Sequence, residues 1–214
     1  MKFEMRSVKP QRLTRVEQQT VTRERLLVAA GRVFSRLGYG GASIDLIAAE
    51  AGFSKGAVYS NFESKEAIFL ELLRLHMARD MAELEKIVSL KPDKLSSAVT
   101  EWLKTMHADS DCPLLVTELQ LHARRNPNFA KQYYALQDKQ TRTLGRLLES
   151  YFKALSTPVP IDPFDLAASL TALAHGVGLQ TPPAKRRGPP TPNAAGRVID
   201  IILKKLTGRT HSRP

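Results

Sequence analysis

Apolar side chains recur at the three- and four-residue spacing of a helix face along most of the chain. No stretch of useful length alternates with the two-residue period of a β-strand. Prolines, glycines and capping serines divide the pattern into segments, because these residues interrupt, end or begin helices. The sequence therefore predicts an all-α protein, with helices at residues 22–37, 44–51, 55–62, 65–88, 95–108, 113–125, 127–155, 163–180 and 193–206.

Two of the predicted helices, 44–51 and 55–62, are short and are separated by a turn that contains Gly52, which is the geometry of a helix-turn-helix motif. Apolar residues brace the second short helix against the long helix before it: Ile44, Ile47, Ala48 and Phe53. The opposite side of the second helix is left to solvent and carries Lys55, Gly56, Ala57, Tyr59, Ser60 and Asn61. Small residues on that side let a backbone approach base edges in a major groove.

Residues 22–73 resemble the DNA-binding domain of TetR-family transcriptional regulators, in the run RERLLVAAGRVFSRLGYGGASIDLIAAEAGFSKGAVYSNFESKEAIFLELL. The most specific parts of the match are residues 38–39, 43–48, 54–59 and 62–67. Two residues depart from the family pattern. Asn61 stands where His or Tyr is commoner, and Gly31 stands inside the first helix where alanine is commoner. The departure at Asn61 bears on the expected sequence preference more than on DNA binding.

The resemblance implies a homodimer that binds a palindromic operator in double-stranded DNA, with its two recognition helices in successive major grooves. By position, the residues expected to face bases are Lys55, Gly56, Ala57 and Ser60. The residues expected to face phosphates are Thr22, Ser43, Tyr59, Asn61 and Lys65. Replacing Lys65 by Ala is accordingly expected to weaken operator binding and to flatten its salt dependence.

The resemblance also implies a division into a basic flexible arm (1–21), the helix-turn-helix domain (22–73) and a larger helical-bundle domain (74–214) that dimerises and binds a small effector. Family members dimerise through their last two main helices, and the last predicted helix here is apolar over more than one face. The expected interface residues are Leu166, Leu170, Leu173, Val177, Val198, Ile201 and Ile202. The expected function is a repressor that a small molecule releases from DNA. An activator of the same fold and a nonspecific basic architectural DNA-binding protein remain as alternatives.

The effector pocket is expected to combine apolar and polar side chains. Its candidate residues are Trp102, Met106, His107, Glu118, His122, Tyr133, Tyr134 and Gln137. Glu118 and His122 share a helix face, and His107 or Cys112 would offer a third metal ligand, but the set matches no recognised motif and no metal is predicted. His175 is expected to be a packed histidine. No cofactor and no enzymatic activity are expected, because phosphate-binding glycine loops, nucleophile elbows and paired carboxylates are missing.

The formal net charge of +11 is concentrated at the two ends of the chain. Residues 1–65 carry +5, residues 66–184 carry −1 and residues 185–214 carry +7. Only the first of these blocks coincides with the helix-turn-helix motif, and the Pro-rich basic loop 182–192 is expected to be an exposed connector. A single cysteine, short apolar runs and a polar N-terminus predict a cytoplasmic protein without membrane contact.

Overall fold

The computed structural model describes residues 14–105, 112–180 and 194–208, which form nine helices and no strand. In chain order these are α1 (Arg15–Gly41), α2 (Ile44–Ala51), α3 (Lys55–Tyr59), α4 (Lys65–Val88), α5 (Pro92–Thr105), α6 (Cys112–Arg125), α7 (Pro127–Ala154), α8 (Pro163–Gln180) and α9 (Ala194–Leu206). The prediction of an all-α fold is confirmed. Residues 1–13 of the predicted arm and the whole predicted loop 182–192 lie outside the described residues.

Helix α1 begins at Arg15, well before its predicted start at Thr22. Thr14 is the cause, because it forms a capping box: its hydroxyl accepts from the Glu17 amide, and the Glu17 carboxylate accepts from the Thr14 amide at 2.7 Å. The expectation of a flexible arm up to residue 21 is therefore wrong for residues 15–21, which are helical.

The corner at the end of α1 depends on Gly38, whose φ of +69° interrupts the helical backbone before the last residues of α1. Only glycine adopts this conformation without strain, as the predicted glycine stop requires. Helix α3 ends at Tyr59 rather than at Phe62. The chain turns after Tyr59, where the Asn61 amide donates to the Val58 carbonyl at 3.0 Å.

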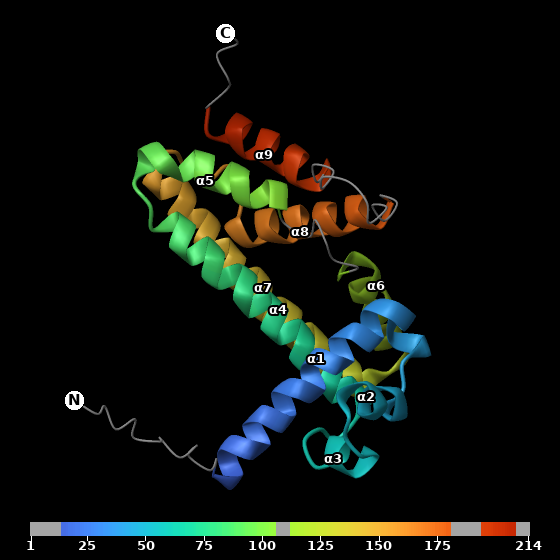
Figure 1. Cartoon of the computed structure of the whole chain (residues 1–214). Coiled ribbons are helices and arrows are strands. Elements are labelled where there is room, and N and C mark those ends of the chain that lie inside the picture. The colour runs from blue at the N-terminus through green and yellow to red at the C-terminus, as the bar shows by residue number, and fades with distance from the viewer. Residues whose placement is uncertain (1–13, 106–111, 181–193, 209–214) are drawn as a thin grey trace, which may run out of the picture.

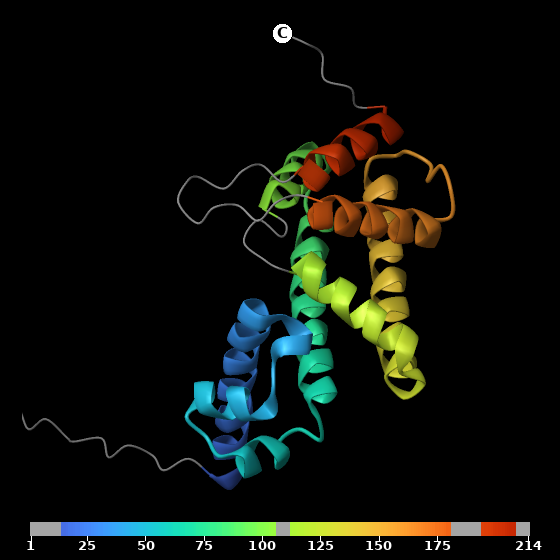
Figure 2. The same ribbon diagram turned by 90° about the vertical axis from the view of Figure 1, so that its right-hand side faces the viewer.

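Helices α4 and α7 lie side by side through the middle of the molecule and form its scaffold (Figure 1). Helices α1 to α3 gather at one end of this pair, and α5, α8 and α9 gather at the other end, as Figure 2 shows from the side. Helix α6 contacts both α1 and α8, and so connects the two ends. This arrangement separates the helix-turn-helix segment from the helices expected to dimerise.

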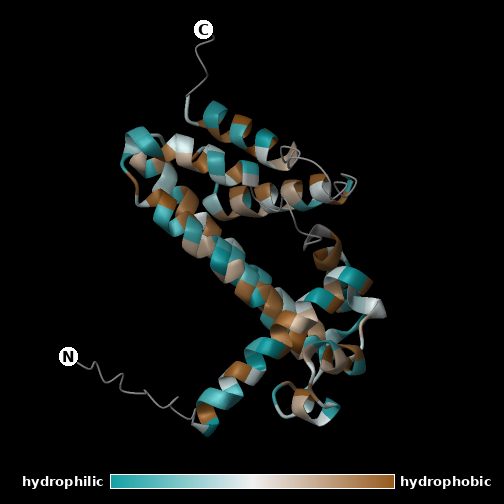
Figure 3. Cartoon of the chain, viewed as in Figure 1, coloured by the Kyte–Doolittle hydropathy of each residue, from teal (hydrophilic) through white to brown (hydrophobic). Residues whose placement is uncertain are grey.

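The first of two hydrophobic clusters fills the space around α1 to α4, and Figure 3 shows brown, apolar ribbon where these helices meet. Phe34, Ile47 and Val58 are fully buried in it. Leu119 of α6 and Tyr133 of α7 belong to the same cluster. The helix-turn-helix segment therefore shares its core with the following helices, and the domain boundary predicted after residue 73 does not coincide with a gap in packing.

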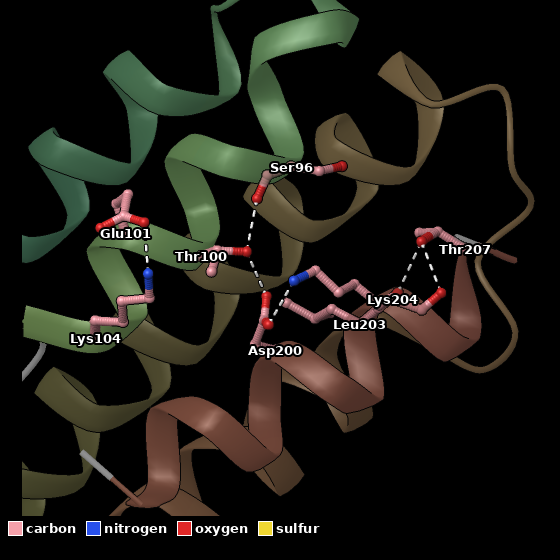
Figure 4. A network of polar contacts seen from close by, with 8 residues as sticks. All are labelled: Ser96, Thr100, Glu101, Lys104, Asp200, Leu203, Lys204 and Thr207. Carbon is pink, nitrogen blue, oxygen red and sulfur yellow. Dashed lines mark hydrogen bonds and ion pairs between the residues drawn. The ribbon is translucent and has the colours of Figure 1, made fainter. Parts of the chain in front are cut away.

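The second cluster packs α5, α8 and α9 against the far part of α7. A polar contact also links α5 to α9: the Thr100 hydroxyl donates to Asp200 at 2.6 Å, and Lys204 pairs with the same carboxylate at 2.7 Å (Figure 4). The two helices approach closely at Gly196, where an added Cβ would lie 2.0 Å from the Leu103 carbonyl oxygen. Close backbone packing of α5 against α9 at Gly196 therefore adds to the apolar cluster and the polar contact at this end of the molecule.

Candidate nucleic-acid interface and ligand cavity

The helix-turn-helix segment is positioned by two serine caps and one left-handed glycine. The Ser43 hydroxyl accepts from the Leu46 amide at 3.2 Å, and the Ser54 hydroxyl accepts from the Ala57 amide at 3.2 Å. Gly52, with φ of +71°, ends α2 and turns the chain toward α3. Each cap satisfies amides that the helix itself leaves unpaired, so the start of each short helix is fixed.

One face of α3 is buried and the other is open. Val58 is fully buried, whereas Lys55, Gly56 and Ser60 are exposed and Ala57 is partly exposed. The space beside Gly56 is almost empty, since an added Cβ would meet only the Ser54 hydroxyl, at 3.7 Å. Three of the four residues expected to face bases thus lie on a short helix that exposes its backbone, and Ser60 caps the end of that helix.

The residues expected to face phosphates are placed less uniformly. Tyr59 is 51% exposed, which fits a phosphate contact and not a position in the core. The hydroxyl of Thr22 donates to the Gln18 carbonyl at 2.8 Å, and that of Ser43 caps α2. The side-chain Nδ2 of Asn61 donates to the Ala57 carbonyl at 2.8 Å, so this side chain folds back on α3.

Lys65 has a different environment from the expected one. Its ammonium donates to the carbonyls of Tyr39 at 2.8 Å and Ala42 at 2.9 Å, and it lies 4.3 Å from the Tyr39 ring centre. Burial lowers the pKa of Lys65, while the nearby carboxylates of Glu66 and Glu118 act in the opposite direction. The structure therefore assigns Lys65 to the corner between α1 and α2, which corrects the expectation of a free phosphate-seeking lysine.

Replacing Lys65 by Met is expected to lower the free energy of unfolding by about 2 kcal/mol, because two buried carbonyls lose a charged donor. Urea denaturation measures this loss. The salt dependence of DNA binding is expected to stay unchanged in the folded variant, since the ammonium is already bound to the carbonyls of Tyr39 and Ala42. A flattened salt dependence with unchanged stability would instead restore the phosphate role.

Helix α6 holds the corner at Gly38 from the other side. The Glu118 carboxylate accepts a short hydrogen bond from the Tyr39 amide, and the His122 ring lies 2.6 Å from the Glu66 carboxylate on α4. Burial, followed by the charge of Glu66, raises the pKa of Tyr39 to about 12, so its hydroxyl stays neutral. Helix α6 is thereby attached to the end of α1 and the start of α4 by two polar contacts.

A cavity of about 120 Å³ lies between α4, α5, α7, α8 and α9. Its walls are mostly apolar, and Val116 of α6 also lines it. Its polar side chains are His76 and Asp80 of α4, Trp102 of α5, Gln140 of α7, and Thr171 and His175 of α8. This concave, mainly apolar space with a few convergent polar groups has the character of a small-molecule site.

Of the eight residues proposed for the pocket, Trp102 lines this cavity. Glu118 and His122 contact α1 and α4 instead, which is a correction. Tyr133 is buried in the first cluster, where its hydroxyl accepts from Gln137 at 3.0 Å, and Tyr134 is exposed, so these three also lie away from the cavity. Met106 and His107 lie outside the described residues.

The sequence reasoning missed the polar lining from α4 and α7. His76 and Asp80 interrupt a helix face that otherwise presents Leu73, Met77 and Leu84 to the interior. Polar residues at three- and four-residue spacing within an apolar stripe were the available signal. His175 does pack inside the protein, as expected, and its ring also lines the cavity.

Asp80 carries an energetic cost when it is ionised, because its carboxylate is partly buried. Burial raises its pKa; His76 and Arg79 act to lower it, and Glu83 acts to raise it. His175, which lines the cavity from α8, has a pKa that burial lowers. A carboxyl with a raised pKa in the folded state stabilises the fold below its unfolded pKa, and this stability is lost as the pH rises through the folded pKa.

Asp80→Asn is therefore expected to be more stable than the original protein near neutral pH, with a difference that narrows as the pH falls. Chemical denaturation at a series of pH values measures this difference. Asp138→Asn is the matched control, because Asp138 is exposed and pairs with Arg142 at 2.8 Å on the surface of α7. If the unfolding free energies of the two variants depended on pH in the same way, burial of the Asp80 carboxylate would not destabilise the fold as stated.

The expected dimer residues fall into two groups. Leu166 and Leu170 are buried within the chain's own second cluster, so the structure leaves them unavailable to a partner. Leu173, Val177 and Ile202 are partly buried against the same cluster. Val198 is 41% and Ile201 57% exposed, and Leu179 at the end of α8 is 48% exposed. Of the expected interface residues, the exposed ones therefore lie on α9, and Leu179 adds exposed apolar surface at the end of α8.

A family model described as bacterial regulatory proteins of the tetR family matches residues 26–72. The uncharacterized HTH-type transcriptional regulator YerO of Bacillus subtilis is 29% identical over 163 residues, which are 72% of this chain and 53% of YerO. The HTH-type transcriptional repressor AcnR of Corynebacterium diphtheriae is 29% identical over 151 residues, which are 67% of this chain and 73% of AcnR. The chain thus matches about half the length of YerO.

Solved structures share the fold. A putative TetR-family regulator from Mesorhizobium loti superposes with a TM-score of 0.67 at 19% identity, over 92% of this chain and 98% of that one. A putative regulator from Saccharomonospora viridis, in complex with choline, superposes with a TM-score of 0.60 at 24% identity, over 86% and 96%.

These relatives carry the names of transcriptional regulators. Within the described ranges, no helix is both long and apolar enough to cross a bilayer, and no three His, Cys, Asp or Glu side chains converge as metal ligands. The matched family model, the curated relatives and the shared fold lead to one conclusion. Residues 26–72 match the tetR family of bacterial regulatory proteins, and the described helices have the fold of solved TetR-family regulators.

Proposed function

We propose that the protein is a transcriptional repressor that binds a palindromic operator as a homodimer and leaves it when a small effector fills the cavity. The observation that carries this proposal is α3, which is capped at Ser54, anchored by buried Val58 and open at Lys55, Gly56 and Ser60. A short helix that presents small and polar residues from a rigid support is suited to reading base edges in a major groove.

Exposed apolar residues on α9 support the homodimer. Val198 and Ile201 lie one helical turn apart on the side of α9 that faces away from the chain's own core. A second copy that packs α8 and α9 against the same helices would cover them, since a two-fold interface brings the same surface of both subunits together. Such a dimer also supplies two copies of α3 for two half-sites.

Ile201→Glu is expected to weaken dimerisation by about 2 kcal/mol or more, because the two-fold axis places each new carboxylate in the same apolar interface. Sedimentation equilibrium measures the dissociation constant. Leu75→Glu, at a similarly exposed apolar residue of α4 (42% exposed), is the control. If both variants dimerise as tightly as the original chain, another surface forms the dimer.

Helix α6 supports the coupling between effector and DNA. Val116 lines the cavity, while Glu118 and His122 on the same helix contact Tyr39 and Glu66 beside the helix-turn-helix segment. A ligand that displaces α6 would therefore move the DNA-binding helices. Release by a ligand is also consistent with the neighbour that binds choline, and repression with the similarity to AcnR.

The proposal is tested by selecting the DNA that the protein retains from a random pool. A gel mobility shift then measures how well this DNA stays bound against excess bulk DNA. The expected result is retention of a symmetric sequence in the presence of competitor. Equal loss of all sequences to the competitor would favour the alternative, a nonspecific basic DNA-binding protein. Release of the retained DNA by a small molecule tests the effector part separately.

A further inference from the structure

We infer that the cavity binds a small organic amine in its protonated form, with Asp80 as the counter-ion, Gln140 as a second hydrogen-bond acceptor and an apolar body packed between the helices. This inference rests on the proposed function in one respect only, which is that the bound molecule acts as the effector. The choice of ligand class follows from the charges, the hydrogen-bonding atoms and the size of the cavity.

The charges that line the cavity favour a cation. Asp80 is the one acid among the described lining residues, and these residues include no lysine or arginine. Asp80 is partly buried, and a carboxylate whose ionised form is disfavoured by burial is stabilised by an ammonium group bound beside it. His76 also lines the cavity, 3.5 Å from the Asp80 carboxylate, and among the described lining residues it is the one side chain that forms an ion pair with Asp80.

The hydrogen-bonding atoms favour a ligand that donates protons. The side-chain oxygen of Gln140 is buried and accepts no hydrogen bond from the described part of the chain. A buried acceptor without a donor costs free energy, which a ligand N–H would recover. Asp80 on α4 and Gln140 on α7 line the same cavity, so both acceptors are open to the N–H groups of a bound ligand.

The cavity walls limit the size and polarity of the remaining part of the ligand. Trp102 and Tyr151 offer aromatic surface, and Met77, Leu148 and Leu170 offer aliphatic surface. A volume of about 120 Å³ is small beside drug-sized pockets of roughly 300–1,000 Å³. The ligand is therefore a short-chain or single-ring amine, and a carboxylate of similar size would meet the repulsion of Asp80 with no lysine or arginine in the described lining to offset it.

Isothermal titration calorimetry with four probes of one chain length tests the inference: hexylamine, hexyltrimethylammonium, hexanol and hexanoate. Hexylamine is expected to bind at least about tenfold more tightly than each of the others, since it alone supplies both the charge and the N–H donors. Equal or tighter binding of hexanoate or hexanol would overturn the assignment to a cation. Equal binding of the quaternary compound would overturn the role of Gln140.

Two variants locate the contacts. Asp80→Asn is expected to reduce hexylamine affinity at least about tenfold, and Gln140→Leu to reduce it less but measurably. Asp138→Asn, which removes the same charge from the surface of α7, is expected to bind like the original protein. Denaturation curves confirm that each variant is folded. Unchanged affinity in folded Asp80→Asn would overturn the inference.

The ligand class and the effector role can fail independently. Calorimetry reports binding in the cavity, whereas a mobility shift with the retained DNA reports release. Binding of hexylamine without release would support the ligand class and contradict the effector role in the proposed function. Release by hexanoate, with no binding of hexylamine, would support an effector site and overturn the amine.

Discussion

Gly56→Glu is expected to reduce specific DNA binding at least about 100-fold. Gly56 is exposed on the open face of α3, where its Cβ position meets only the Ser54 hydroxyl at 3.7 Å. A glutamate there would place a carboxylate against the phosphates and block the approach of the helix backbone to the bases, and like charges brought together cost several kcal/mol. Fluorescence anisotropy with labelled operator DNA measures the loss.

The fold should tolerate this change, because glutamate has a higher helix propensity than glycine and the surrounding space is open. Ser150→Glu is the control for added charge, since Ser150 is exposed on α7, away from the helix-turn-helix segment. Its DNA affinity is expected to fall only slightly. Binding of Gly56→Glu within about threefold of the original protein would show that α3 does not enter the groove.

Gly196→Ala is expected to cost about 3 kcal/mol of unfolding free energy. An added Cβ would lie 2.0 Å from the oxygen and 2.8 Å from the carbon of the Leu103 carbonyl. Both atoms belong to the backbone of α5, so relief requires that α5 and α9 separate. Separation would also stretch the contact between Thr100 and Asp200.

Gly31→Ala is the matched control, because nothing lies within 4 Å of the Cβ position at Gly31 in the interior of α1. The methyl group there should raise stability by about 1 kcal/mol through helix propensity alone. Urea denaturation at a fixed protein concentration compares the two variants. Opposite signs are expected; a stabilised Gly196→Ala would contradict the close approach of α5 and α9.

The helical organisation could be predicted because local signals fix it. Gly52 and the caps at Ser43, Ser54 and Ser64 each depend on residues within one helical turn, and the structure confirms the helices that they delimit. The early start of α1 was also encoded locally, in the pairing of Thr14 with Glu17. Residues 15–21 are mostly polar, so the apolar periodicity does not extend the predicted helix over them.

The cavity could not be predicted in the same way, because it depends on which helices meet. Asp80, Gln140 and His175 come from α4, α7 and α8, and no spacing along the chain relates them. The roles of Lys65 and Glu118 likewise depend on the corner at Gly38, which brings α6 against α1. Periodicity identified faces of helices, but the partner of each face is a property of the tertiary packing.

The central claim is that two copies of α3 read one operator. Hydroxyl-radical footprinting of the dimer on the DNA that it selects tests this claim most directly, because protection maps the contacts along both strands. The predicted result is two protected half-sites related by two-fold symmetry, about 10 base pairs apart from centre to centre, and no protection with Gly56→Glu. A single protected site without symmetry, or continuous protection along any DNA, would contradict the claim.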